Sequence, residues 1–183
     1  MPTTKGPRAD ALRNRQRVLA IAEQLFAEEG KSAGLLDIAA RAGVGAGTVY
    51  RHFPTKESLY AAVISARLAQ LLDLVPALPD DPPGTRIVEF WRLAVRQIRQ
   101  NVALCELVTA VDQHVDIDAA VRQRYLATLD ELVDRARDAG RLREDLTTPD
   151  VISMLAAAAT AEARSHDAPP GRLADLIADS IFM

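Results

Sequence analysis

Cysteine and aromatic residues are scarce in this sequence of 183 residues, which contains one cysteine, Cys105, and only 4% Phe, Trp and Tyr. A single cysteine cannot form a disulfide within the chain, so the fold depends on an apolar core, for which a hydrophobic content of 49% is sufficient. No run approaches the roughly 18 apolar residues of a membrane-spanning helix, and no amino-terminal stretch resembles a signal peptide. We therefore expect a cytoplasmic protein that does not contact membranes.

Patterns typical of strands and of catalytic sites are also missing. No segment alternates apolar and polar residues over the length of a strand, which predicts an all-α fold. No Ser-His-Asp set or pair of carboxylates lies on a recognisable scaffold, so we expect neither an enzyme nor a cofactor. The stretch "DQHVDID" has acidic or His side chains at alternate positions, but it lacks a second ligand cluster and predicts no metal site; these side chains are Asp112, His114, Asp116 and Asp118.

Charge is distributed unevenly along the chain. Residues 1–56 contain nine Lys and Arg against five Asp and Glu, whereas the whole chain has a net charge of -3. A basic amino-terminal part, here called the head, is followed by an acidic remainder of the chain. This distribution indicates a polyanionic partner for the head, although chance variation among solvated charges would give the same pattern.

Helical spacing and punctuation divide the chain into parts. Residues 1–9 contain Pro and Gly among polar residues and are expected to be a flexible arm, followed by a three-helix domain over 10–55. Residues 56–183 are expected to hold a long linker helix, which Thr55 caps, and a carboxy-terminal bundle, for about nine helices in total. The proline-rich loop 76–85 separates the two sets of long helices. The bundle helices are expected from residue 86, at 103–114, at 117–139, at 149–164 after a Thr148 cap, and at 170–182.

The stretch "GVGAGTVYRHF" (43–53) has glycines at alternate positions before a polar cluster. A dinucleotide-binding turn needs a G-x-G-x-x-G motif after a strand, and a phosphate-binding loop needs Lys followed by Ser or Thr after its last glycine; neither pattern is present. Two short helices over 35–42 and 46–53, joined at Gly43, instead predict a helix-turn-helix motif. On the second helix Val49 and Phe53 are expected to be buried, leaving small, polar and basic residues outside, where they can meet the major groove.

Residues 12–64, through "RVLAIAEQLFAEEG" and "DIAARAGVGAGTVYRHFPTKESLYAAV", resemble the DNA-binding domain of the tetracycline-repressor (TetR) family of bacterial transcriptional regulators. The resemblance implies contacts to DNA from the outer face of the second motif helix and its surroundings. Further contacts would come from the first helix, where Arg8, Arg13 and Arg17 are the local candidates. The predicted DNA-binding residues are Ala46, Gly47, Thr48, Tyr50, Arg51, His52, Lys56, Arg13 and Arg17. Relatives often have a hydroxyl residue where this chain has Gly34 and Gly45, which puts two phosphate contacts in doubt.

The same resemblance implies that the last two helices pair with their mates in a homodimer. Small and apolar residues on these helices fit such an interface, although they would equally close the core of one protomer; they are Leu155, Ala158, Ala159, Leu173, Leu176 and Ile177. A pocket for an unidentified small molecule is expected among aromatic and polar residues of the bundle, each of which could instead be plain core. These residues are Phe90, Trp91, Val95, Ile98, Cys105, Tyr125 and Met154.

Together these features predict a homodimeric repressor that binds a palindromic operator and releases it when an effector enters the helical domain. Two other readings remain at the level of sequence, namely a helical-bundle enzyme and a ligand-binding dimer that has lost DNA binding.

Overall fold

The computed structural model describes residues 7–29, 32–99, 116–165 and 168–183. Within these residues it contains eight α-helices and no strand, which confirms the all-α prediction. The helices are α1 (Pro7–Glu29), α2 (Leu35–Arg41), α3 (Ala46–His52), α4 (Lys56–Leu74), α5 (Arg86–Arg99), α7 (Ala119–Asp138), α8 (Thr148–Arg164) and α9 (Arg172–Ile181), with a 3-10 turn η2 (Val75–Ala77) after α4. The helix expected at 103–114 lies outside the described residues.

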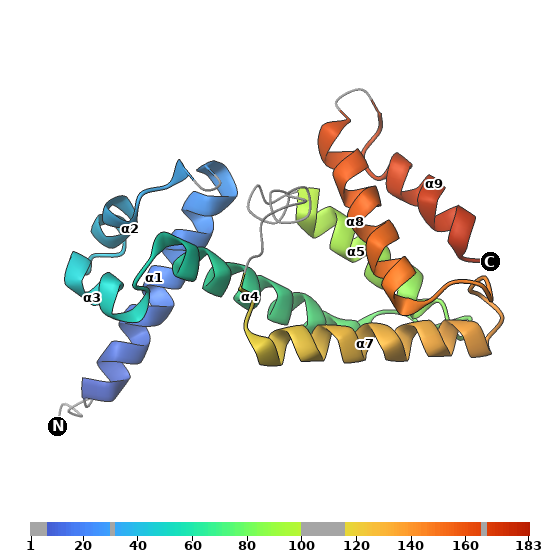
Figure 1. The fold of residues 1–183 in the computed structure, drawn as a ribbon, viewed down its shortest axis with the longest axis horizontal. Helices are drawn as coiled ribbons and strands as arrows, with labels where there is room; N and C mark the ends of the chain where they lie inside the picture. Colours follow the sequence, from blue (N-terminus) through green and yellow to red (C-terminus); the bar gives the residue numbers. More distant parts are fainter. Residues whose placement is uncertain (1–6, 30–31, 100–115, 166–167) are drawn as a thin grey trace.

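The molecule has two apolar cores, and α4, which runs between two groups of helices (Figure 1), contributes to both. The first core joins α1, α2, α3 and the start of α4 around Phe26, Ile38 and Leu59. The second joins the end of α4 to α5, α7, α8 and α9 around Trp91 and Leu129. The aromatic rings of Phe26 and Tyr60 meet edge to face at 5.1 Å between centroids, which fixes α4 against α1.

Residues Lys56–Ala77 are long and apolar enough to cross a membrane by length and composition alone. Packing accounts for this apolar character, because the helix places Leu59 and Ile64 in the first core and Leu72 in the second. A helix that is buried by neighbours along its length is expected to be apolar on several faces.

Local signals explain the first unit. The N–H groups of Gly43 and Val44 donate to the carbonyls of Ala40 and Ala39, both at 3.1 Å, and Gly43 has φ of +64°. This is the left-handed turn that ends a helix and reverses the chain, so α2 stops where glycine permits it.

The long helix α4 begins where the sequence predicts. Thr55 Oγ1 accepts from the N–H of Ser58 at 3.0 Å, and Ser58 Oγ accepts from the N–H of Thr55 at 3.2 Å. These two reciprocal hydrogen bonds satisfy amide donors that a helix start otherwise leaves without partners.

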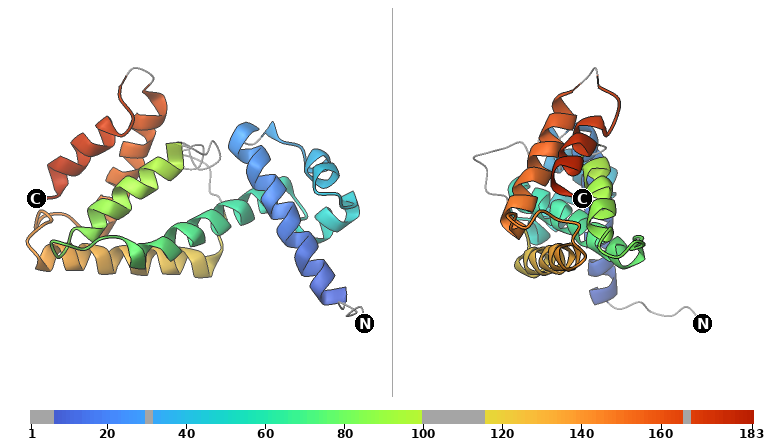
Figure 2. Two further views of the ribbon diagram at one scale, coloured as in Figure 1. Left: turned by 180° about the vertical axis from the view of Figure 1, so that it is seen from behind. Right: turned by 90° about the vertical axis from the view of Figure 1, so that its right-hand side faces the viewer.

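In the second unit α4, η2 and α5 are connected by a loop that Asp80 organises. Its carboxylate accepts from the N–H groups of Gly84 and Arg86 at 3.0 and 3.2 Å and forms an ion pair with Arg135 on α7 at 3.1 Å. Burial alone would raise the pKa of Asp80, but these hydrogen bonds and the arginines outweigh it and hold the pKa below its usual value. Helices α5, α8 and α9 pack together on one side of the α4 and α7 pair (Figure 2).

Two predicted boundaries need correction. Helix α1 begins at Pro7, so that residues 7–9 are helical rather than part of the arm. Helix α8 is capped by Thr147 and not by Thr148, because the Thr147 hydroxyl accepts from the N–H of Asp150 and the Asp150 carboxylate accepts from the N–H of Thr147. Threonine at either position fits the sequence pattern. Thr147 is the cap because it lies three residues before Asp150, the spacing at which the two residues can exchange hydrogen bonds.

Candidate nucleic-acid interface and ligand cavity

The outer face of α3 is small and polar, as the sequence predicts. Val49 and Phe53 point into the first core, whereas Gly47, Tyr50 and Arg51 are exposed, with 47% of Tyr50 accessible. Ala46, Thr48 and His52 lie half-buried at the edges of this face. A side chain added at Gly47 would meet no atom of the described residues within 4 Å, so this position of the helix is open to another molecule.

Basic side chains surround α3. Lys56 follows it at the first position of α4, and Arg15 of α1 places its guanidinium 5.4 Å from the ring centroid of Phe53. Arg13 forms an ion pair with Asp10 one turn away, whereas Arg17 is exposed and has no ion pair among the described residues. Arg8 lies in a part of α1 whose side chains are outside the described set. Of the basic residues of the head, Arg51 lies on the α3 face, Lys56 follows it and Arg15 reaches Phe53, whereas Arg17 is exposed on α1.

The N-termini of α2 and α3 have glycine caps. Gly34 and Gly45 adopt extended conformations and supply no side-chain hydrogen bond to the following helix, in agreement with the sequence. The first amide groups of these two helices therefore keep donors for an external acceptor such as a phosphate oxygen.

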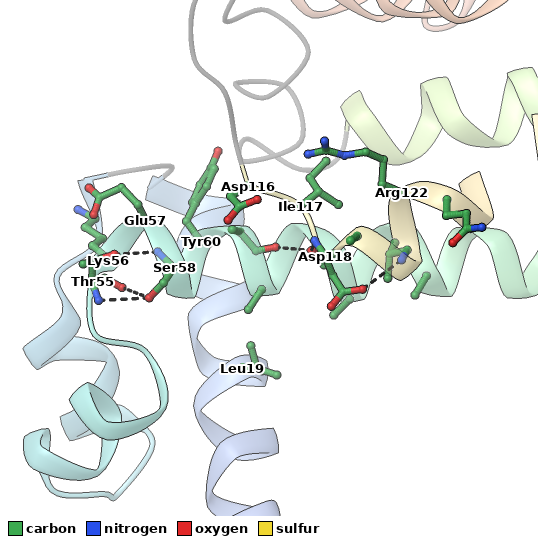
Figure 3. Close-up of a pocket in the computed structure, with 18 of the residues that line it drawn as sticks. Leu19, Thr55, Lys56, Glu57, Ser58, Tyr60, Asp116, Ile117, Asp118 and Arg122 are labelled. Atoms are coloured by element: carbon green, nitrogen blue, oxygen red, sulfur yellow. Dashed lines mark hydrogen bonds between the residues drawn. The ribbon is translucent and has the colours of Figure 1, made fainter. Parts of the chain in front are cut away.

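A groove of about 1450 Å³ lies where the first unit meets the start of α7 (Figure 3). One wall is the first half of α4 with Thr55, Lys56 and Ser58, and the other is the segment Asp116 to Asp118 with the first turns of α7. Ser65, which is 7% exposed, links the walls: its hydroxyl donates to the Ala61 carbonyl at 2.7 Å and accepts the N–H of Asp118 at 3.0 Å. Asp118 in turn caps α7 through the N–H groups of Ala120 and Val121.

A second, smaller cavity of about 550 Å³ lies inside the bundle between α4, α5, α7 and α8. Its described lining is mainly apolar and includes the predicted pocket residues Phe90, Ile98 and Tyr125. Arg122 and Leu126 line both this cavity and the groove, so the first turns of α7 separate the two spaces.

The other predicted pocket residues lie elsewhere. Trp91 and Val95 are 1% and 2% exposed and are absent from the described lining; the Trp91 Nε1–H donates to the Ala174 carbonyl at 3.2 Å and its ring packs edge to face on Phe182. These two side chains lie on the side of α5 that faces α8 and α9. Both sides of α5 are apolar, so the spacing of its residues could not show which side faces the cavity. Met154 packs against the core but does not line the cavity. Cys105 lies outside the described residues.

Polar groups in the cavity come from residues that sequence reasoning missed, apart from Tyr125. Arg67 and Gln70 of α4, Gln97 of α5 and Arg122 of α7 contribute to the lining. Burial raises the pKa of Tyr125 to about 12, so its hydroxyl remains a neutral donor at physiological pH. The sequence does mark Arg67, since it interrupts an otherwise apolar stretch of α4. The direction in which its side chain points, however, depends on how α4 packs.

Glu162 is the one buried acidic residue among the described side chains, at 5% exposure, and the sequence reasoning did not select it. Its carboxylate accepts from the N–H groups of Gly171, Leu173 and Ala174 at 2.9, 2.7 and 3.1 Å and lies 3.4 Å from Arg99 Nε. Burial alone would raise the pKa of Glu162, but the three N–H donors and Arg99 hold it below its usual value. The carboxylate thus caps α9 from within α8.

The residues predicted for a dimer interface fall into two groups. Leu155, Ala158 and Ala159 are buried in the core of the protomer, with no more than 6% exposed, so they cannot form a surface. Leu155 and Ala158 belong to the second core, and Leu155 also lines the bundle cavity, so these residues close the core of one protomer, which is the alternative that the sequence left open. On α9 the exposed surface divides into an apolar side and a charged side; the apolar side has Leu173, Leu176 and Ile177, and the charged side has Arg172, Asp175 and Asp179.

Among the described residues no group of three or more His, Cys, Asp or Glu side chains is placed to hold a metal ion. Of the "DQHVDID" stretch, Asp112 and His114 lie outside this set, and Asp118 serves as the α7 cap.

Two sequence models of protein families match the chain. Residues 18–63 match the model described as bacterial regulatory proteins of the tetR family, and residues 82–181 match the carboxy-terminal domain of SbtR-like transcriptional regulators. A curated HTH-type transcriptional regulator of Staphylococcus aureus is 41% identical over 75 residues, and this alignment spans 40% of each chain.

Solved structures match over nearly the whole chain. A TetR transcription regulatory protein of Mycobacterium vanbaalenii is 34% identical, with a TM-score of 0.65, and the match covers 97% of this chain and 100% of the other. A TetR transcriptional regulator of Streptomyces coelicolor is also 34% identical, with a TM-score of 0.62 and coverage of 92% and 98%.

Proposed function

The chain belongs to the TetR family of bacterial regulatory proteins, and from this premise we propose that it is a repressor whose two heads bind a palindromic operator. The observation that carries the proposal is the exposed face of α3, where Gly47, Thr48, Tyr50 and Arg51 stand on a helix anchored by buried Val49 and Phe53. A small, polar and basic face of this kind suits base edges and phosphates in the major groove.

Within this proposal each side chain has a role set by its position. Thr48 offers a hydroxyl and a methyl group near the start of α3, where α3 approaches the bases most closely. Tyr50, His52 and Lys56 contact phosphates, and Arg51 at the centre of the exposed face contacts base edges or phosphate. Arg17 extends the basic surface along α1.

The same proposal assigns the bundle cavity to a small-molecule effector and the apolar side of α9 to a homodimer. The cavity is apolar with a few polar groups, as binding sites for small molecules generally are. The groove at the head shares Arg122 and Leu126 with it, so a molecule that moves the first turns of α7 also changes their contact with α4 through Ser65 and Asp118. A protein that acts on operator DNA in this way belongs in the cytoplasm.

The test is fluorescence anisotropy with a labelled duplex taken from the region upstream of the gene, at two stated salt concentrations. Tyr50→Ala is expected to weaken binding about tenfold, and Lys56→Ala to weaken it severalfold and reduce the salt slope by about one. Arg124→Ala is the matched control, because this exposed arginine lies on α7 and pairs with Asp73, far from α3. Unchanged affinity in both head variants would show that α3 does not enter the groove.

A ligand-binding dimer without DNA binding is the remaining alternative function. It predicts that the wild-type protein binds no upstream duplex even at low salt, where phosphate contacts are strongest.

A further inference from the structure

The described lining of the bundle cavity carries charge of one sign. Among the described residues its lining includes the arginines Arg67 and Arg122 and no Asp or Glu. The rest of the described lining is apolar except for Gln70, Gln97 and Tyr125, so a bound molecule would meet hydrocarbon on most sides and positive charge where α4 lies against the start of α7.

Arg67 has an unused donor at this end. Its Nε–H is buried and has no hydrogen-bond partner, and it is the one side-chain polar atom in that condition among the described residues. The remaining guanidinium nitrogens are engaged, because one forms an ion pair with Glu23 of α1 and the other lies 3.5 Å from Gln70 Oε1. A buried donor without a partner destabilises the folded protein, and a ligand acceptor would remove this cost.

Two neutral donors accompany Arg67. Tyr125 makes no hydrogen bond with any described residue, and Gln97 lines the same space from α5. A carboxylate or similar anion accepts several hydrogen bonds at once, and bonds that involve a charged donor and acceptor are the strongest of this kind. Among the described lining residues a cation would meet two arginines and no carboxylate, since Glu23, which pairs with Arg67, is not part of that lining.

We propose that the effector is an apolar molecule with one anionic group, and that this group binds Arg67 in competition with Glu23. The inference rests on the proposed function, because it names the chemical class of the effector for the cavity assigned there. Its consequence for the head is direct, since Glu23 lies on α1 of the first unit and Arg67 on the shared helix α4.

The first experiment measures ligand binding without DNA, by isothermal titration calorimetry of the full chain. Decanoate and decyltrimethylammonium below their micellar concentrations, and decanol below its solubility limit, each have a ten-carbon chain and differ in the charge of the end group. The wild-type protein is expected to bind decanoate at least tenfold more tightly than decanol and the cation most weakly. Equal affinity for decanoate and decanol would overturn the inference, as would no binding of decanoate.

Single-residue variants then test which side chains bind the anionic group. Arg67→Gln is expected to remove the preference for decanoate over decanol, and Tyr125→Phe to reduce it severalfold. Arg92→Gln is the control, because Arg92 pairs with Glu89 and Asp175 and is not part of the described lining. Circular dichroism checks that each variant is folded. A preference that persists in folded Arg67→Gln and Tyr125→Phe would overturn the assignment.

The competition between the anionic group and Glu23 for Arg67 is tested by changing Glu23. Glu23→Gln releases Arg67 and is expected to tighten decanoate binding about two- to fivefold, in the range of a partly exposed ion pair. Glu28→Gln, an exposed change on the same helix, is expected to have no effect. Unchanged affinity in Glu23→Gln would show that Glu23 does not compete.

DNA affinity measured without decanoate separates the two proposals. If the protein binds its duplex but does not prefer decanoate, the effector class is wrong while the repressor function stands. If it prefers decanoate but binds no duplex, the repressor function fails and the cavity chemistry stands.

Discussion

At the scale of single residues, the head depends on two glycines that differ in backbone conformation. Gly43 has φ of +64°, a conformation that other residues adopt at a cost, whereas Gly45 has φ of -67° and ψ of 144°, which any residue adopts. A side chain added at either position would meet no atom within 4 Å. The two positions therefore isolate the effect of the backbone from that of packing.

Gly45→Ser is expected to stabilise the protein slightly, because a serine hydroxyl can accept an amide hydrogen at the start of α3. The gain relative to glycine is a few tenths of a kcal/mol, or about 1 °C in Tm for a chain of this length. Gly43→Ser is expected to destabilise it by about 1–2 kcal/mol, because serine is strained in the left-handed region. Differential scanning calorimetry measures both, and a lower Tm for Gly45→Ser would show that the cap is not formed.

These residues also show which features of the head could be predicted from sequence. Gly43, the Thr55 cap and the buried pair Val49 and Phe53 depend on contacts within a few positions, so their spacing was sufficient. Phe90 and Trp91 are adjacent in sequence, yet one lines the cavity and the other packs on Phe182. That choice depends on the placement of α8 and α9, which no local pattern contains.

At the scale of secondary-structure elements, α9 is joined to α8 through a buried carboxylate. Glu162 accepts three N–H groups at the start of α9, and α9 has a glycine N-cap without a side-chain hydrogen bond of its own. Its place among Leu155, Ala158 and Ala159 on one face of α8 was readable from the spacing. Its partners were not, because they lie nine to twelve residues further along the chain.

Glu162→Gln is expected to lower the free energy of unfolding by about 2 kcal/mol at neutral pH, because the amide cannot replace the charge and presents its own donors to three N–H groups. Asp179→Asn, an exposed change on α9, is the control and is expected to have little effect. Urea denaturation of the three proteins measures the difference.

The dependence on pH provides a second readout. Because folding holds the pKa of Glu162 below its usual value, its contribution is complete above the pKa of the unfolded state and is lost as pH falls through that of the folded state. The wild-type advantage over Glu162→Gln should therefore shrink in acid below the ordinary pKa of glutamate. Other carboxylates, such as Asp80, titrate in both proteins, so the difference isolates Glu162. An advantage that does not change with pH would show that the charge of Glu162 is not what α9 requires.

At the scale of the whole molecule, α9 lies at the far end from α1, α2 and α3 (Figure 1). Its outer surface has apolar Leu173, Leu176 and Ile177 on one side, with 52% of Leu176 exposed. An apolar stripe of this kind on a helix that already has a buried face fits a second copy of the chain. Two heads joined at this end would bind both halves of a palindrome at once.

Leu176→Glu is therefore expected to convert a dimer into a monomer, because it places a charged carboxylate from each copy in the apolar surface that the two copies would bury. Light scattering after size-exclusion chromatography measures the mass. Since a joined pair of heads gains roughly 100-fold or more in affinity from effective concentration, the variant should lose binding to the palindrome by a factor of that order. Affinity for a duplex with one half-site should change little, because α3 and the residues around it are untouched.

Ala127→Glu is the matched control, because it adds the same charge at an exposed position of α7, outside α9, and should leave both mass and DNA affinity as in the wild type. A Leu176→Glu protein that remains dimeric would place the interface elsewhere. A monomer that keeps wild-type affinity for the palindrome would instead show that each head binds independently. The coupling of the cavity to the operator would then have to act within one protomer, through α4 and the Ser65 contact with Asp118.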